Sequence, residues 1–178
     1  NIVNNTTTAN VINTFNIAAN RNIVLCGVGG QGTVLASKLL AAAAMSKDIP
    51  VMSAETIGMA QRGGSVFSHL RMGKNLYSPM IKTGTADLII GFEPGETVRM
   101  LPYLKEHGQV VVSTHAFKPV TATLSGSSYD APPMINYLKE YVENLTLIDA
   151  DSICREIGSQ KVLNMVLLGA AIRTGVLD

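Results

Sequence analysis

A glycine cluster near the start of the chain has the composition and position of an anion-binding loop. The run from Gly27 to Gly32 fits the spacing G-x-G-x-x-G and joins a short apolar segment to an alanine-rich one, as at a turn from a strand into a helix. The first N–H groups of a helix have no partner within it, and the helix dipole favours a negative charge beside them. The sequence therefore predicts a phosphate or another anion at this turn. The predicted ligand-binding residues here are Gly27, Gly29, Gly30, Gln31, Gly32 and Thr33.

The same glycines have a second explanation that requires no ligand. They allow a tight turn and a close approach of helix and sheet, because a glycine carries no Cβ. No Lys-Ser or Lys-Thr pair follows the cluster, so it is not the phosphate loop of a nucleoside triphosphatase.

A second group of polar residues follows the next predicted strand. In a dinucleotide-binding fold, an acid placed like Glu55 accepts hydrogen bonds from a ribose hydroxyl. Arg62 stands beside Gly63, Gly64 and Ser65, where its guanidinium could bind a phosphate or carboxylate while the glycines let main-chain N–H groups approach. The further predicted ligand-binding residues are Glu55, Arg62, Gly63, Gly64 and Ser65. The alternative is a turn whose arginine is solvated or pairs with Glu55.

The sequence offers no catalytic or metal-binding set. His69, His107 and His115 are scattered, and no Ser–His–Asp order can be defended. Cys26 and Cys154 form no Cys-x-x-Cys pair, so we expect no zinc or iron–sulfur site in this chain. Such sparse cysteine usage favours a reducing, cytoplasmic setting.

From Arg21 onward, strand and helix patterns alternate along the chain. This order predicts the α/β class: a three-layer αβα, Rossmann-like domain with a mainly parallel sheet. Ligands of such sheets bind beyond the carboxyl ends of the strands, where the glycine cluster, Glu55 and residues 91–93 would lie. The predicted strands are 23–26, 51–54, 65–72, 88–91, 109–113 and 145–148. The predicted helices are 33–46, 93–104, 133–144, 151–157 and 161–174.

Composition limits the partners of the domain. Of the 178 residues, 47% are hydrophobic and only 15% are charged, which favours a large subunit interface, although a monomer with a large core stays open. The net charge is +1 without a basic run, so we expect no nucleic acid; the apolar runs are too short for a membrane span. Residues 1–20 are expected to be an extension or an added arm, and 21–178 a single domain shortened at its C-terminus.

Four segments together resemble a known family, the gamma-type subunits of 2-oxoacid:ferredoxin oxidoreductases. The order of Gln-Arg-Gly-Gly-Ser and Ser-His-Leu-Arg within the second segment is most similar to the small (beta) subunit of indolepyruvate ferredoxin oxidoreductases. The resemblance covers the chain from about Arg21 to Val176. The segments that carry it are 27–32, 53–71, 86–96 and 164–170.

This resemblance implies a subunit that is inactive alone and has no catalytic residue of its own. The family decarboxylates a 2-oxoacid on thiamine diphosphate, passes electrons through iron–sulfur clusters to ferredoxin and transfers the acyl group to coenzyme A. The chain has no Gly-Asp-Gly thiamine signature and no cluster cysteines, so both cofactors are expected on partner subunits. The resemblance implies that this chain packs on those subunits and helps to hold coenzyme A, with ferredoxin an indirect partner.

Other functions stay open on the sequence alone. The glycine cluster and Glu55 also fit a free-standing NAD(P)-dependent oxidoreductase, and a structural assembly subunit would need no ligand at the loop. The identity of the 2-oxoacid is also open, although the resemblance favours an aryl pyruvate. The isolated chain could form a homodimer.

Overall fold

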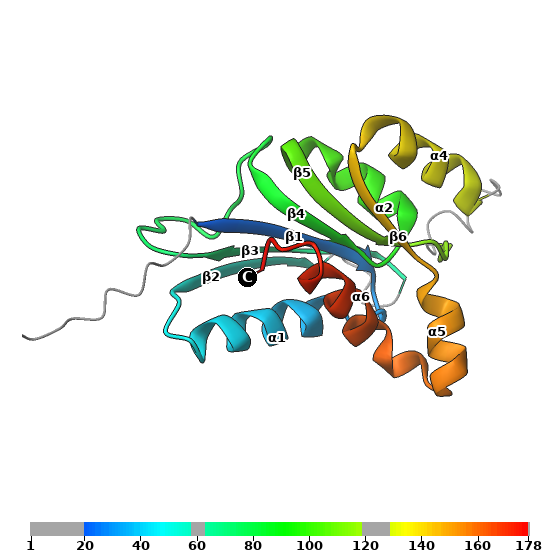
Figure 1. The fold of residues 1–178 in the computed structure, drawn as a ribbon, viewed down its shortest axis with the longest axis horizontal. Coiled ribbons are helices and arrows are strands. Elements are labelled where there is room, and N and C mark those ends of the chain that lie inside the picture. The colour runs from blue at the N-terminus through cyan, green and yellow to red at the C-terminus, as the bar shows by residue number, and fades with distance from the viewer. Residues whose placement is uncertain (1–19, 58–62, 119–128, 178) are drawn as a thin grey trace, which may run out of the picture.

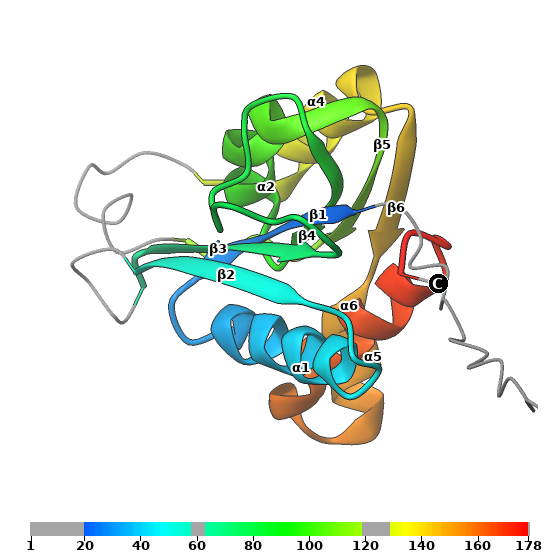
Figure 2. The ribbon, with the colours of Figure 1, turned by 90° about the vertical axis from the view of Figure 1, so that its left-hand side faces the viewer.

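The computed structural model describes residues 20–57, 63–118 and 129–177. In these ranges, helices cover both faces of one sheet, whose strand order is β2-β3-β1-β4-β5-β6 (Figures 1 and 2). The strands are β1 (Arg21–Val28), β2 (Val51–Ile57), β3 (Ser65–Met72), β4 (Ala86–Gly91), β5 (Leu104–Ser113) and β6 (Asn144–Ile148). The helices are α1 (Thr33–Met45), α2 (Pro94–Met100), α4 (Ala131–Tyr141), α5 (Ala150–Ile157) and α6 (Leu163–Ile172), with short turns η1 (Leu101–Tyr103) and η2 (Gln160–Val162).

The predicted three-layer α/β class is confirmed, with one reversed strand. β1, β4, β5 and β6 pair in parallel, whereas β3 is antiparallel to both neighbours, β1 and β2. The connection 58–64 is too short for the crossover that a parallel neighbour requires, so the chain turns back on itself. β3 therefore separates β2 from β1, whereas in the dinucleotide-binding order the second strand lies directly beside the first.

The register brings several strand ends to one edge of the sheet. Val28 lies opposite Ser65, Ile57 opposite Val66 and Cys26 opposite Gly91. The glycine loop after β1, the end of β2, the start of β3 and the corner after β4 thus meet at the same edge. The sequence predicts the loop, the end of the second strand and residues 91–93 there, whereas the start of β3 joins them because this strand is reversed.

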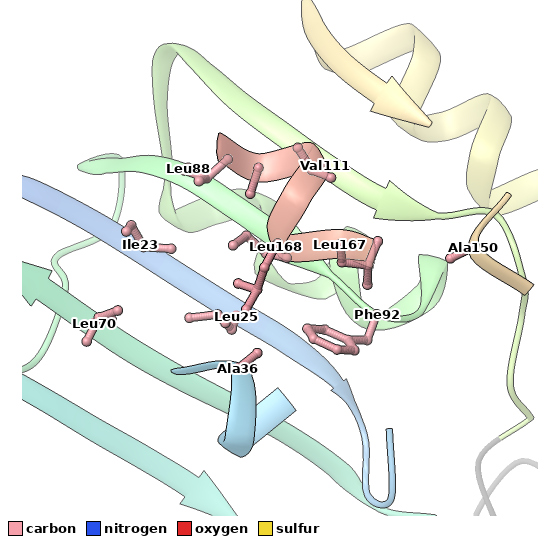
Figure 3. Close-up of a cluster of buried hydrophobic side chains, with 12 residues drawn as sticks. Ile23, Leu25, Ala36, Leu70, Leu88, Phe92, Val111, Ala150, Leu167 and Leu168 are labelled. Atoms are coloured by element: carbon pink, nitrogen blue, oxygen red, sulfur yellow. The ribbon is translucent and has the colours of Figure 1, made fainter. Parts of the chain in front are cut away.

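Two buried clusters hold the layers together. Successive residues of β1 point to opposite faces, so Ile23 and Leu25 pack beneath α1 and α6, while Val24 and Cys26 pack beneath α2 and α4. Figure 3 shows the first cluster, in which Leu25 of β1 lies between Ala36 of α1 and Leu168 of α6. Cys26 is a buried core residue, as its strand position predicts.

Several element ends differ from the prediction. α2 ends at Met100 rather than near residue 104, because Pro102 lacks the N–H that would continue the α-helix, and a short 3-10 turn follows. β2 continues to Ile57, so Glu55 lies within a strand rather than after it. The predicted arm 1–20 lies outside the described residues except for Asn20. In the described part of the chain, every helix falls short of the length and apolar character that crossing a membrane would require.

One histidine is part of the core. His69 is buried in β3, and its ring lies 5.5 Å from the Phe67 ring and 5.0 Å from the Tyr103 ring, centroid to centroid. Its Nδ1 accepts the main-chain N–H of Ile81 at 2.9 Å, whereas Nε2 has no hydrogen-bond partner within the described residues. Burial lowers the pKa of His69 below its ordinary value of 6.5.

This burial predicts a loss of stability in mild acid. Below pH 6.5 the unfolded chain protonates His69 before the folded chain does, so the free energy of unfolding falls as the pH drops, by at most about 1.4 kcal/mol per pH unit. His69→Asn keeps an acceptor for Ile81 but does not titrate. In denaturant unfolding, the free energy of unfolding of the wild type minus that of the variant should be constant above about pH 7. Below pH 6.5 this difference should decrease, because protonation of His69 destabilises only the wild type. Parallel stability curves across this range would contradict the assignment.

Candidate functional site

The glycine loop joins β1 to α1 with two residues in the left-handed region of backbone conformation. Gly30 has a φ of 103° and Gly32 a φ of 88°, values that side-chain-bearing residues rarely adopt. Gly32 is the N-cap of α1, no side chain caps the helix, and its first turn holds no acid. The first internal helix bond runs from the Ala36 N–H to the Gly32 carbonyl at 2.9 Å. The N–H groups of residues 33–35 precede that bond and can bind an anion.

The side chain of Gln31 stabilises the glycine loop through two hydrogen bonds. Its Oε1 accepts the Val28 N–H at 2.7 Å, and its Nε2 donates to the Phe92 carbonyl at 3.1 Å. The side chain therefore ties the glycine loop to the corner after β4. Both of its polar atoms are engaged in this structure, so its contribution to a ligand site is mainly to the shape of the loop.

The turn before β3 lies directly against the glycine loop. The Gly29 N–H donates to the Gly64 carbonyl at 2.8 Å, and the Gly63 N–H donates to the Gly29 carbonyl at 3.4 Å. Gly63 has a φ of 77°. The structure thus brings together the two glycine segments that the sequence predicts as one site.

The remaining predicted side chains are placed differently. Ser65 donates its hydroxyl proton to Glu96 at 2.5 Å, so that proton is not available to a ligand. Glu55 is exposed on β2, with β3 between it and the glycine loop. Arg62 lies outside the described residues.

A buried pair of carboxyl groups adjoins the site, and neither residue is among the predicted ligand-binding residues. Glu93 is 0% exposed and Glu96 2%. One oxygen of Glu93, Oε2, accepts the Glu96 N–H at 2.9 Å and the Tyr129 hydroxyl at 2.9 Å. Burial is the largest influence on Glu93 and raises its pKa, although these hydrogen bonds oppose the shift. Burial likewise raises the pKa of Tyr129.

Two buried oxygens near this edge have no hydrogen-bond partner within the described residues. They are Oε1 of Glu93 and Oγ1 of Thr33. A buried polar atom without a partner costs free energy, and in a native fold such an atom marks stored strain, a catalytic role or a bound water or ion. Around the described residues, no three His, Cys, Asp or Glu side chains gather as metal ligands would.

A separate open hollow of about 660 Å³ lies at the opposite edge of the sheet. It is lined by Tyr137, Tyr141 and the start of β5, and it contains none of the predicted site residues. His107 there has a φ of 56° and bonds Glu143 at 2.7 Å, a contact that raises the pKa of this histidine. Lys105 is paired with Asp87. Because the charged side chains named here already have partners, this hollow is a weaker candidate than the glycine loop.

The structure defines an α/β domain in which no side chain caps the start of the helix after the first strand. Residues 22–178 match the pyruvate ferredoxin/flavodoxin oxidoreductase family, and the chain belongs to that family.

The relatives are subunits of such oxidoreductases. The chain is 40% identical over 158 residues to indolepyruvate oxidoreductase subunit IorB of Methanothermobacter thermautotrophicus, covering 87% of this chain and 79% of the relative. It is 29% identical over 153 residues to the common gamma subunit of the pyruvate/ketoisovalerate oxidoreductases of Thermococcus litoralis, covering 84% and 76%.

A solved structure shares the fold. The pyruvate oxidoreductase subunit PORC of Thermotoga maritima has a TM-score of 0.62 and 20% identity, covering 89% of this chain and 78% of that one. The sequence-based predictions of the family and of the fold class are therefore confirmed.

Proposed function

We propose that the chain is the small, non-redox subunit of a 2-oxoacid:ferredoxin oxidoreductase that acts on an aryl pyruvate, and that its glycine loop holds an anionic group of coenzyme A. Family membership and the 40% identity to an indolepyruvate oxidoreductase subunit support the reaction class and the substrate. The observation that carries the loop's role is the uncapped start of α1, where three N–H groups precede the first helix bond.

The residues of the loop fit a phosphate. Gly30 is exposed, and a Cβ there would meet nothing within 4 Å, so a ligand can approach the main chain closely. Coenzyme A supplies the thiol that accepts the acyl group. The N–H groups of residues 33–35 would bind a phosphate oxygen, and Arg62 would add a positive charge. Such positioning accelerates a reaction without proton transfer by this chain.

Thiamine diphosphate and the iron–sulfur clusters belong to partner subunits in this proposal. The chain has only two cysteines, and both are buried in different parts of the fold. They cannot supply the several thiolates that a cluster requires. Ferredoxin would then meet the cluster-bearing subunit rather than this one.

Arg62→Ala tests the proposed binding of coenzyme A. Loss of a charge-assisted hydrogen bond should raise the KM for coenzyme A in the assembled enzyme about tenfold or more, while bound thiamine diphosphate stays at the wild-type level. Arg155→Ala is the matched control, because Arg155 is exposed and its guanidinium contacts Asp151 and Ser152 of its own helix, α5. An unchanged KM for coenzyme A in an Arg62→Ala enzyme that keeps its thiamine would count against the proposal.

The NAD(P) alternative is disfavoured by the strand order. With β3 between β1 and β2, Glu55 is not on the strand beside the loop, where a ribose-binding acid belongs. Titration of the isolated chain with NADH should accordingly give no saturable change in fluorescence. A structural assembly subunit, the other alternative, predicts normal turnover from every loop variant.

A further inference from the structure

The side chains around the glycine loop form a closed circuit of hydrogen bonds. Gln31 links the loop to the carbonyl of Phe92, and Glu93, the next residue, accepts the N–H of Glu96. Glu96 in turn accepts the hydroxyl of Ser65. The circuit closes through the adjacent glycine turn, since Gly64 accepts the N–H of Gly29. Three segments far apart in the sequence are thus held at fixed spacing.

The carboxylate at the centre of this circuit has few other contacts. Among the described residues, the Glu96 carboxyl group contacts one further polar side chain besides Ser65, that of Arg99 at 3.4 Å, and this arginine is largely exposed. Burying a carboxylate is unfavourable unless hydrogen bonds compensate, and an apolar side chain would fill the space at lower cost. The contact that this carboxylate makes with Ser65 is therefore its clearest purpose in the fold.

The neighbouring carboxyl suits an anion-binding loop only when it is neutral. Glu93 lies one residue from the carbonyl that Gln31 contacts, and a second buried negative charge so near would repel a phosphate. The burial of Glu93, which raises its pKa, favours the neutral acid. Glu96 is then left as the acceptor that fixes Ser65.

We propose that Glu96 is a positioning residue that acts through Ser65: it holds the glycine turn 63–64 against the glycine loop and so fixes the width of the anion site. The inference rests on the proposed function, because it concerns the same site. Neither residue touches the ligand in this account. Ser65, predicted from sequence as a ligand-binding residue, takes the role of a connector.

The test compares Ser65→Ala, Glu96→Ala, Glu96→Gln and the double variant Ser65→Ala/Glu96→Ala in the assembled enzyme. We expect the first two to raise the KM for coenzyme A about five- to tenfold and to leave kcat within about twofold of wild type. Glu96→Gln should keep the wild-type KM, since the glutamine amide oxygen can still accept the hydrogen bond from the Ser65 hydroxyl. The KM of the double variant should equal that of either single variant, because both substitutions remove the same hydrogen bond. Glu106→Ala, at an exposed carboxylate on the opposite edge, is the matched control.

Three outcomes would overturn the inference. The first is a wild-type KM for coenzyme A in Ser65→Ala, a mild change that keeps the fold, while Arg62→Ala raises it; the proposed function would then stand without Glu96. The second is a double variant whose increase in the KM for coenzyme A equals the product of the two single increases. The third is a loss of thermal stability and kcat together in Glu96→Ala that Glu96→Gln does not reverse, as a purely structural role requires. If Arg62→Ala also left the KM unchanged, the proposed function itself would fail.

Discussion

Gly27→Ala is expected to lower the free energy of unfolding by about 3 kcal/mol, the upper end for overpacking a core. A Cβ at this position would lie 2.7 Å from the Cβ of Phe92 and 2.8 Å from both Gln31 Oε1 and Thr33 Oγ1. None of these atoms is the free end of a flexible side chain: the first is next to the main chain and Gln31 is held by two hydrogen bonds. Chemical denaturation of the isolated chain measures the effect.

The same substitution should impair the site, because Gln31 must move to admit the new methyl group. In the assembled enzyme we expect a raised KM for coenzyme A together with the lost stability. Gly169→Ala is the matched control: a Cβ there meets nothing within 4 Å, and alanine in place of a helical glycine stabilises by about 1 kcal/mol. Equal effects of the two variants would contradict the close packing described at Gly27.

Leu25→Ala is expected to lower the free energy of unfolding by about 2–5 kcal/mol and, unlike Gly27→Ala, to leave the glycine loop intact. Leu25 is 0% exposed at the centre of the cluster between β1 and helices α1 and α6, as Figure 3 shows. Its removal leaves a cavity beneath two helices that the sheet cannot collapse to fill. The midpoint and slope of a urea titration give the change.

The control for this prediction lies on the neighbouring helix. Leu35 in α1 is 53% exposed, so Leu35→Ala removes the same atoms from a position that buries little area and should change stability by less than about 1 kcal/mol. Comparable losses for Leu25→Ala and Leu35→Ala would mean that the outer face of α1 carries as much packing as the core.

Local patterns were sufficient to predict the layers and the principal loop. The apolar run into glycine at 27–32 marks a strand–turn–helix by itself, and acid with proline at residues 93–94 marks a helix start, where Glu93 is indeed the N-cap. That the two glycine segments meet also follows from strand ends sharing an edge. The first two of these inferences use residues close together in the sequence, and the third uses the order of the strands.

The side-chain circuit could not be predicted in the same way. The contact between Ser65 and Glu96 joins residues 31 positions apart, and that between Gln31 and Phe92 joins residues 61 apart. Neither contact produces a periodic pattern in the sequence from which it could be predicted. The only hint was two acids three positions apart at the start of α2, which read as ordinary helix capping. The reversal of β3 could have been anticipated, since the connection 58–64 leaves no room for a crossover.

The central claim is that main-chain N–H groups at the start of α1 bind an anionic group of coenzyme A within a larger oxidoreductase. A structure of the assembled enzyme with coenzyme A bound tests it most directly. The account predicts a phosphate oxygen within about 3 Å of the main-chain nitrogens of residues 33–35. Coenzyme A seated elsewhere, with the start of α1 facing only solvent or a partner side chain, would contradict it.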